Sequence, residues 1–480
     1  MNIKMILSTV GKIVLVAAAL MLLPLAVSLC YGEEEYLYFV YTILISVAIG
    51  LPLVLFCKGK NKNIFAREGF ITVALSWIVL SLLGALPFYL SGAIPSFVDA
   101  FFETVSGFTT TGASILTNVE EMAKGLLFWR SFTHWIGGMG ILVFVMAILP
   151  TETGRSIHIM RAEMPGPIVG KLVPKIRSTA KILYLIYMAM TALQIIILLI
   201  SGLSLFEATV YSFGTAGTGG FSLLSSGLAT LTPAQQWIIA LFMLLFGINF
   251  NLYYYMLIGN IKAALKSEEL RVYFIIAAAS TVLITLNIYP LFENFASATR
   301  AAFFQVSSIM TTTGYATVDF NQWPEFSKGI LLILMIIGAC AGSTAGGLKV
   351  SRLILLFKFI KNSCRHVLHP HSVEAMRFED KRVDEQTTKA VAGYFALYMF
   401  CLIAVFTLLC LDKFNIETNA SAAVACFNNI GPGFANVGPM ASYAGYSQFS
   451  KFVLSIAMLM GRLEIYPLLL TFAPSTWVRK

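Results

Sequence analysis

Long apolar runs alternate with short polar stretches along the whole chain of 480 residues. Most runs hold roughly 20 residues or more, the length that a helix needs to cross about 30 Å of hydrocarbon. The pattern predicts ten membrane-spanning helices, at about 13–30, 37–57, 69–92, 127–150, 180–202, 235–258, 272–291, 328–360, 389–411 and 450–473. The first run is long for the core of a signal peptide, and no small-residue cleavage site follows it. We therefore expect it to be a retained transmembrane helix.

The amino-acid composition also indicates a membrane protein. Hydrophobic residues make up 58% of the chain and charged residues 12%, against about 45–50% apolar and about 25% charged residues in soluble proteins. So little polar surface cannot cover a water-soluble particle, and we expect an integral membrane protein. The seven cysteines form no CxxC pair, so the sequence indicates neither a disulfide framework nor a zinc site.

Charged residues are sorted between the two sides of the predicted membrane. If the spans cross alternately, one side receives both chain termini and the basic loops 58–67, 155–177, 262–271 and 349–389, whereas the loops on the other side are acidic. An excess of Lys and Arg marks cytoplasmic loops, so we expect both termini in the cytoplasm. The net charge of +9 then reports orientation in the membrane, and we expect lipid and no nucleic acid around the protein.

Four loops on the acidic side repeat one pattern, at 98–115, 204–223, 297–318 and 418–440. Each has a short helix-compatible stretch and then a glycine element, and the element glycines lie 108, 94 and 117 residues apart. Internal repetition of this kind predicts an architecture built from equal units. We expect an all-α polytopic membrane protein with four helix–pore-helix–helix repeats in a pseudo-fourfold arrangement around one pore. The predicted units are two extra N-terminal helices in 1–66 and repeats at 67–176, 177–268, 269–385 and 386–480.

The repeated loops have the chemistry of a cation filter. Backbone that enters a bilayer must be buried in protein or face a water-filled cavity, and inward-turned carbonyls can replace the hydration shell of an alkali cation. Glycine allows this turn because it adopts φ > 0 freely, a Thr hydroxyl adds an oxygen, and a pore helix aims its negative C-terminal end at the ion. Thr-Gly pairs are also ordinary turn formers, but four matching loops favour a filter. Its predicted residues are Thr110, Thr111, Gly112, Ala113, Thr218, Gly219, Gly220, Phe221, Thr312, Thr313, Gly314, Tyr315, Asn429, Ile430, Gly431 and Pro432.

With these loops and the segments WRSFTHWIGGMGIL at 129–142 and GACAGSTAGGLKVSRL at 338–353, the chain resembles the Trk/Ktr/HKT superfamily of potassium transporters. The two extra N-terminal spans are typical of the Trk branch. The resemblance implies potassium uptake across the bacterial cytoplasmic membrane, a homodimer, and a cytosolic nucleotide-binding regulatory ring of the RCK type as partner. A glycine in every loop matches the potassium-selective members. Asn429 and Pro432 depart from the pattern of the other loops, so the ring cannot be fully fourfold.

A gate is expected where the span at 328–360 carries a run of small residues. Four glycines would cost a helix roughly 1 kcal/mol each relative to alanine, so we expect the helix to break at 338–347. A tight packing seam between helices is the alternative. Members of the resembled family carry an intramembrane loop here that obstructs the pore below the filter. The gate residues expected in this loop are Gly338, Gly342, Ser343, Thr344, Gly346 and Gly347.

Arg462 lies near the centre of the last predicted span. An Arg there costs at least ~2.5–3.5 kcal/mol unless it faces water or a partner. The resembled family has an arginine beside the intramembrane loop at this place, so we expect Arg462 to take part in the gate. The alternatives are an ion pair with Glu464 or a side chain that reaches the cytoplasmic edge of the membrane.

The remaining sequence patterns give no support for a phosphate-binding loop, a metal site or a catalytic site. Residues 342–350 approach a phosphate-binding loop, but the Lys and Ser/Thr positions do not fit. The cytoplasmic patch His366, His369 and His371 lacks the spacing of a metal site. His134 is interpreted as a hydrogen-bonded packing residue, with a proton relay as the alternative. No catalytic constellation is present, so we do not expect an enzyme.

A coupled transporter, moving potassium with H⁺ or Na⁺, is the alternative to a channel-like pore. It would need a dedicated carboxylate on the ion path. Glu103, Glu207 and Glu464 are the candidates, and we expect Glu103 and Glu207 at the starts of pore helices, where the helix dipole favours acids.

Overall fold

The computed structural model describes residues 2–57, 66–140, 176–369 and 376–477. Within these ranges, six helical spans are long and apolar enough to cross a membrane: Ile3–Tyr31, Tyr36–Phe56, Arg67–Leu90, Thr179–Ile200, Glu268–Leu291 and Glu385–Leu409. These six coincide with six of the ten predicted spans. The other four predicted spans are interrupted or reach beyond the described residues.

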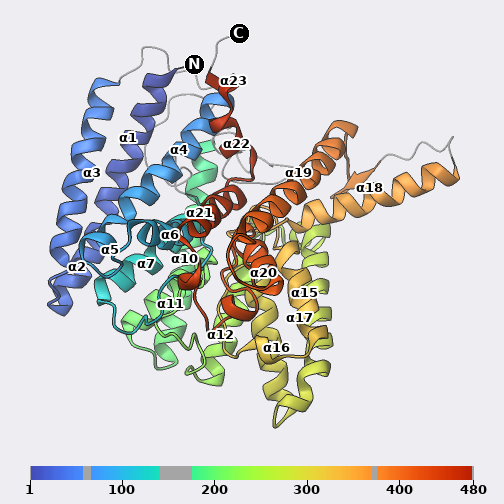
Figure 1. Cartoon of the computed structure of the whole chain (residues 1–480). Helices are drawn as coiled ribbons and strands as arrows, with labels where there is room; N and C mark the ends of the chain where they lie inside the picture. The colour runs from blue at the N-terminus through green and yellow to red at the C-terminus, as the bar shows by residue number, and fades with distance from the viewer. Residues whose placement is uncertain (1, 58–65, 141–175, 370–375, 478–480) are drawn as a thin grey trace.

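The two extra N-terminal spans lie together at one side of the molecule (Figure 1). The first consists of α1 (Ile3–Leu20) and α2 (Leu22–Tyr31), and the second is α3 (Tyr36–Phe56). α1 and α3 cross where two glycines meet, since a Cβ atom added to Gly11 would lie 2.9 Å from the carbonyl oxygen of Gly50. Small residues at such a crossing let helix backbones approach closely in a membrane.

Most of the remaining helices form four repeats, each with a first helix, a pore helix and a second helix (Figure 1). The first helices are α4 (Ala66–Gly84) with α5 (Leu86–Leu90), α10 (Ile176–Ile200), α15 (Glu268–Ile288) and α19 (Glu385–Leu409). The pore helices are α6 (Phe97–Phe108), α11 (Leu205–Gly217), α16 (Phe295–Met310) and α20 (Ile416–Phe427). The second helices are α7 (Lys124–Gly138), α12 (Pro233–Phe246), α17 (Glu325–Ile337) and α21 (Gln448–Arg462).

The repeats close into a ring because the second helix of each one packs on the pore helix of the next. α7 packs on α11, α12 on α16, α17 on α20, and α21 returns to α6. The pore helices are enclosed by this packing, and every residue from Ala100 to Phe108 in α6 is buried. A helix that is buried on all faces belongs to the core. The predicted pseudo-fourfold arrangement of helix–pore-helix–helix repeats is confirmed.

The second helices are shorter than predicted. The spans predicted at 235–258 and 450–473 are not single continuous helices. α12 is followed by α13 (Phe250–Leu257) after a bend of 91°. α21 is separated from α22 (Tyr466–Phe472) by residues 463–465, of which Glu464 and Ile465 have positive φ. In the span predicted at 127–150, α7 ends at Gly138 and residues 141–150 lie outside the described residues.

The break predicted in the span at 328–360 is confirmed. α17 ends at Ile337 because Gly338 takes a φ of 68°, and helix resumes only at α18 (Val350–Leu368). α18 projects away from the ring (Figure 1).

Short elements complete the described chain. They are α14 (Ile261–Leu265), α23 (Pro474–Trp477), the 3₁₀ turns η1 (Tyr289–Leu291), η2 (Phe320–Gln322), η3 (Ala435–Val437) and η4 (Tyr443–Gly445), and a hairpin of β1 (Arg377–Phe378) and β2 (Lys381–Arg382). The strands pair antiparallel, with Phe378 opposite Lys381. This hairpin is a small exception to the expected all-α fold. The start of α1 and the short α23 lie at the same end of the molecule (Figure 1).

Candidate functional site

All four pore helices end in the same backbone motif. A residue at the end of each helix takes a left-handed conformation with φ between 55° and 57°; these residues are Thr110, Thr218, Thr312 and Asn429. The N–H of the left-handed residue bonds to the carbonyl three residues earlier, and the next N–H reaches five residues back, as from Thr111 N to Ser106 O at 2.8 Å. This is the Schellman arrangement, which usually has glycine at the left-handed position.

Threonine is an unusual residue at this position, because its branched Cβ crowds the left-handed backbone. The conformation costs roughly 1–2 kcal/mol for a residue with a Cβ, so the surrounding structure must hold the three equivalent threonines in it. Sequence reasoning predicted positive φ for the glycines and missed it for these residues. Two of the hydroxyls bond to residues that follow the pore loops in the chain: Thr312 Oγ1 accepts from Gly346 N at 2.7 Å, and Thr110 Oγ1 accepts from Arg462 Nη1 at 3.4 Å.

Two residues further on, the glycine of each element also has positive φ, as predicted. The values are 78° for Gly112, 80° for Gly220, 83° for Gly314 and 97° for Gly431. The residue between has no positive φ, so the hand of the backbone alternates through the loop. Alternation of this kind turns successive peptide groups so that their carbonyls can face one side. We name these segments loop 1 (110–113), loop 2 (218–221), loop 3 (312–315) and loop 4 (429–432).

The glycines meet carbonyls of the neighbouring loop in a closed cycle. A Cβ atom added to the glycine would overlap the carbonyl oxygen of the residue before the next loop's glycine, or lie 2.7 Å from it in the last case. The pairs are Gly112 with Gly219, Gly220 with Thr313, Gly314 with Ile430, and Gly431 with Thr111. No side chain fits at these four positions, because the backbones of adjacent loops are in direct contact.

Different side chains hold the neighbouring loops together. Between loops 2 and 3, the Tyr315 hydroxyl lies 3.3 Å from the carbonyl oxygen of Tyr211 and 3.4 Å from that of Phe221. Between loops 4 and 1, Asn429 Nδ2 donates to Thr111 Oγ1 at 3.0 Å. Asn429 therefore replaces threonine with a side chain that reaches across to the first repeat. The expected departure from fourfold symmetry lies in these side chains, while the backbone motif is kept.

We call the contacts between neighbouring repeats joints. The other two joints are made by residues outside the glycine elements. Between repeats 3 and 4, the side chain of Asn321 pairs with both main-chain groups of Ala435, at 3.2 Å and 3.0 Å. Between repeats 1 and 2, Arg130 joins Glu103 to Ser222 O, with distances of 2.6 Å and 3.1 Å. The first of these joints is made by a neutral amide and the second by a buried ion pair.

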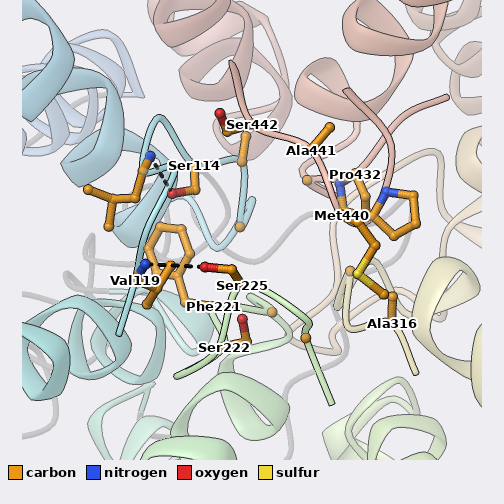
Figure 2. A pocket seen from close by; sticks show the side chains of 18 of the residues that line it. Ser114, Val119, Phe221, Ser222, Ser225, Ala316, Pro432, Met440, Ala441 and Ser442 are labelled. Atoms are coloured by element: carbon orange, nitrogen blue, oxygen red, sulfur yellow. Dashed lines mark hydrogen bonds between the residues drawn. The ribbon is translucent and has the colours of Figure 1, made fainter. Parts of the chain in front are cut away.

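An open vestibule of about 300 Å³ lies directly outside the ring of loops. All four element glycines line it, as do the residues that follow them, Ala113, Phe221, Tyr315 and Pro432. Figure 2 shows the hydroxyls of Ser114, Ser222, Ser225 and Ser442 around the opening, and loops from all parts of the ring meet there. Of the described residues that line the vestibule, Arg130 alone carries a charge.

The glycine-rich segment 338–349 lies on the opposite side of the loops. It reaches loop 3 through the bond from Gly346 N to Thr312 Oγ1. It is also tied to the α12–α13 bend, because Cys340 N donates to Gly247 O at 3.1 Å and Phe250 N donates to Gly342 O at 3.0 Å. We call residues 338–349 the inner loop. Of the residues expected in the gate, Gly338, Gly342 and Gly347 take positive φ, between 67° and 71°.

Two buried side chains that sequence reasoning missed hold the inner loop. Lys349 Nζ donates to the carbonyls of Ala345 and Gly346. The Oε1 atom of Glu269 accepts from Ala341 N at 2.8 Å and from Ser351 N at 3.0 Å, so that it clamps both ends of the segment. In the sequence, both residues look like members of charged cytoplasmic stretches, and no local pattern sets them apart.

Arg462 lies at the end of α21, between the inner loop and the loops of the ring. Its guanidinium donates to Thr344 O at 2.7 Å and to the carbonyls of Gly137 and Gly138 at 2.6 Å each. The expected alternative of an ion pair with Glu464 is not what forms, because Glu464 pairs with Arg352. The remaining cavity beside Arg462 and Ser343 measures about 20 Å³, room for about one water.

Of the remaining candidates, His134 is the packing residue that the sequence predicts. Its Nδ1 lies 2.7 Å from Gly107 O, and its Nε2 accepts from Phe221 N at 3.3 Å. The two bonds require a neutral ring with the proton on Nδ1, since the carbonyl only accepts and the amide only donates. His366 is exposed near the end of α18 and His369 follows it, whereas His371 lies outside the described residues. In the described part of the chain, no cluster of His, Cys, Asp or Glu is suited to a metal ion.

Of the two carboxylates predicted at the starts of pore helices, one lies there and the other does not. Glu207 lies in the first turn of α11 and forms a capping box with Ser204, as expected. The prediction for Glu103 is wrong, because this residue lies in the middle of α6 and the acid of the first turn is Asp99. Glu103 is held there by its buried partner Arg130, which a helix-dipole argument does not consider.

Comparison with known proteins finds relatives that are named as Trk potassium uptake proteins or as potassium transporters. The model of the TrkH family, described as cation transport protein, matches residues 37–479. The Trk system potassium uptake protein TrkH of Salmonella typhimurium is 35% identical over 485 residues, which cover 99% of this chain and 100% of the relative. TrkG of Escherichia coli is 31% identical over 99% of both chains. The crystal structure of the potassium transporter TrkH from Vibrio parahaemolyticus superposes with a TM-score of 0.89, at 31% identity over 100% of both chains.

Replacing Gly112 or Gly314 by Ser should reduce discrimination between K⁺ and Na⁺. Each new Cβ overlaps the carbonyl of the next loop, so that carbonyl must move. We expect the K⁺/Na⁺ flux ratio to fall at least about tenfold, which corresponds to roughly 1.4 kcal/mol. Rubidium and sodium uptake into liposomes holding the purified variants measures this ratio. Gly92→Ser is the matched control, because Gly92 also has positive φ (74°) but no atom lies within 4 Å of an added Cβ. An unchanged ratio in both ring variants would contradict a filter made of these loops.

Proposed function

The chain belongs to the TrkH family of cation transport proteins, and we propose that it takes up potassium ions across the cytoplasmic membrane as the membrane subunit of a Trk system. Potassium is the transported substrate, and the proposed path runs through the ring of loops 1–4. The observation that carries this proposal is the closed cycle in which each element glycine meets a carbonyl of the next loop. Such a cycle gathers main-chain oxygens from four segments around one axis.

In the proposed mechanism, potassium leaves its water shell in the vestibule and is coordinated by loop carbonyls. Carbonyl oxygens can replace the hydration shell of K⁺, and the alternating hand of the loop backbone supports an inward orientation. The negative ends of the four pore helices face the same region and favour a cation there. The threonine hydroxyls at the inner end, those of Thr110 and Thr312, add further oxygens on the cytoplasmic side.

The inner loop is the proposed gate. It lies beneath loop 3, and its bonds to Arg462, Lys349 and Glu269 hold it across the path. Arg462 also places a positive charge next to Thr110, where it repels a cation that leaves the filter. Opening then requires the inner loop to withdraw from these donors together with the Arg462 side chain. The glycines of the inner loop, with their unusual backbone angles, provide the conformational freedom for this change.

A channel-like pore fits the carboxylates better than coupled transport does. Each candidate for a coupling carboxylate is already engaged: Glu103 with Arg130, Glu464 with Arg352, and Glu207 in the cap of its own helix. Coupling to H⁺ or Na⁺ would need one of these groups to exchange its partner for the coupling ion during transport.

We also propose the cytoplasmic partner and the assembly. A cytosolic nucleotide-binding ring would dock on the basic loops 151–177 and 349–389, with both chain termini on the same side, and the membrane subunit would form a homodimer. The first loop lies almost wholly outside the described residues. In the second, α18 exposes Lys361 and Arg365, and α18 follows the inner loop directly. A partner that moves α18 would therefore act on the gate.

Uptake of potassium by the purified protein tests the transport proposal. Liposomes that contain the full chain should accumulate ⁸⁶Rb⁺ down an imposed K⁺ gradient, and excess external K⁺ should compete with Rb⁺. Uptake should not depend on a pH or Na⁺ gradient imposed in addition. Absence of Rb⁺ uptake from folded protein, with the gate variants below equally inactive, would overturn the proposal. A strict requirement for either extra gradient would instead establish the coupled alternative.

Opening of the gate should follow from deletion of Gly342–Gly346 or from Arg462→Ala. Both changes remove the bond between Arg462 and Thr344. A hydrogen bond to a charged group contributes about 1.5–3 kcal/mol, so we expect flux without the partner to rise about tenfold or more. Rb⁺ uptake of oligomers that remain intact in size-exclusion chromatography measures this, and the K⁺/Na⁺ ratio should stay that of the wild type. Arg365→Ala, on the exposed part of α18, is the control. Flux no faster than wild type in both variants would rule out the gate.

Affinity capture with the full chain in detergent should recover a cytosolic nucleotide-binding protein from the same cells. Charge reversal of Lys361 and Arg365 to Glu should reduce recovery, since both are exposed on α18 and exposed charges steer association. Replacing the acidic residues Glu34 and Glu35, which lie in the predicted extracellular loop, by Lys is the control and should leave recovery unchanged. Failure to recover such a protein with ATP, ADP, NAD⁺ or NADH present would contradict the proposed partner.

A further inference from the structure

One buried ion pair lies beside the ring of loops and is not part of the filter or the gate. Glu103 in α6 and Arg130 in α7 are 1% and 3% exposed, and Arg130 Nε lies 2.6 Å from Glu103 Oε1. Removing two charges from water is costly, so a buried pair contributes little stability compared with apolar side chains of similar volume. Stability alone therefore gives no reason for charges at this position.

The carboxylate of Glu103 holds the segment that leaves loop 1. Ser114 Oγ donates to its Oε1 atom at 3.0 Å, and Ile115 N donates to its Oε2 atom at 3.0 Å. These residues follow Gly112 by two and three positions. Together with Arg130 the carboxylate has three donors, and two of them determine where the chain runs after the loop 1 glycine.

The guanidinium of Arg130 holds the equivalent segment of loop 2. Its Nη1 donates to Ser222 O at 3.1 Å, two positions after Gly220. The Arg130 Cζ atom lies 3.5 Å from the centre of the Phe221 ring, and a cation at this place is attracted to the aromatic face. Loop 1 and loop 2 are thus fixed relative to each other through one pair of charges.

The first repeat alone carries this carboxylate. Counted seven positions back from each left-handed residue, the four repeats have Glu103, Tyr211, Gln305 and Ala422. The charge is therefore specific to the joint between loops 1 and 2. Arg130 also lines the vestibule, where an uncompensated positive charge would oppose the entry of cations.

We propose that Glu103 and Arg130 are a positioning pair that sets ion selectivity, with Glu103 also neutralising Arg130 at the mouth of the pore. This inference rests on the proposed potassium pore. It assigns the pair two separable effects. The bonds to Ser114, Ile115 and Ser222 determine the spacing of loops 1 and 2 and therefore K⁺/Na⁺ discrimination, and the charge balance determines the rate of cation entry.

Three variants of the full chain separate the two effects. Glu103→Gln leaves the Arg130 charge uncompensated and weakens the joint, so both Rb⁺ uptake and the K⁺/Na⁺ permeability ratio should fall, each by roughly tenfold. Arg130→Met removes the charge and the joint, and should lower the ratio more than the uptake. The double variant has neither charge, so its uptake should recover to within about threefold of wild type while the ratio stays low.

Reversal potentials in planar bilayers give the ratio, and ⁸⁶Rb⁺ uptake into liposomes gives the rate. The reversal potential does not depend on how much of the protein is folded, which keeps the ratio informative for weakly expressed variants. Glu207→Gln is the matched control, because Glu207 also lies on a pore helix but caps only its own helix. It should preserve both quantities.

A wild-type ratio in Glu103→Gln and Arg130→Met would overturn the proposal. It would equally be overturned if the double variant took up Rb⁺ no faster than Glu103→Gln, or if none of the three conducted although each ran as an intact oligomer. Failure of the potassium pore itself is recognised separately, because wild type and Glu207→Gln would then also fail to discriminate K⁺ from Na⁺.

Discussion

Direct contact between the backbones of four loops is the constraint on which the rest of this structure depends. Main-chain groups at membrane depth need partners from protein, water or ions. The four loops meet this requirement by ending each pore helix in a Schellman motif and then turning glycine against the carbonyl of the next loop. The same closeness extends to the second helices, since a Cβ atom on Gly137 would overlap Phe108 O and one on Gly461 would overlap Phe427 O. Each of these glycines lies one residue before the end of its helix, so α7 and α21 both end at these close contacts.

The ring is fourfold in its backbone and asymmetric in its side chains. The four joints are made by an ion pair, a tyrosine hydroxyl and two asparagine amides. The inner loop comes from the third repeat alone, and Arg462 reaches it from the fourth. The four units thus share one backbone geometry and divide the other contacts among them. A single chain with four unequal repeats permits this division, which four identical subunits could not.

Three buried or half-buried cationic side chains near the loops each have two or more hydrogen-bond acceptors. Arg130 has Glu103 and a carbonyl, Arg462 has three carbonyls, and Lys349 has two. A charge in this setting costs several kcal/mol unless it is compensated. Main-chain carbonyls supply most of that compensation, so charges and backbone geometry are linked throughout the region around the loops.

The sequence by itself determined the features that depend on local composition. Apolar runs of membrane length predicted the six long helical spans. The repeated glycine elements predicted the four loops and the positive φ of Gly112, Gly220, Gly314 and Gly431. The small residues at 338–347 predicted the break after α17. These inferences succeeded because helix length and glycine conformation are set by a few neighbouring residues.

Only the tertiary structure decided which distant groups meet. The contacts at the bend after α12, the clamp by Glu269 and the pairing of Glu103 with Arg130 all involve residues far apart along the chain. A local pattern cannot predict them, because the free energy that stabilises a bent helix or a buried charge comes from partners that the fold brings together. For the same reason, Arg462 was recognisable as an unusual charge, but the carbonyls that hold it were not.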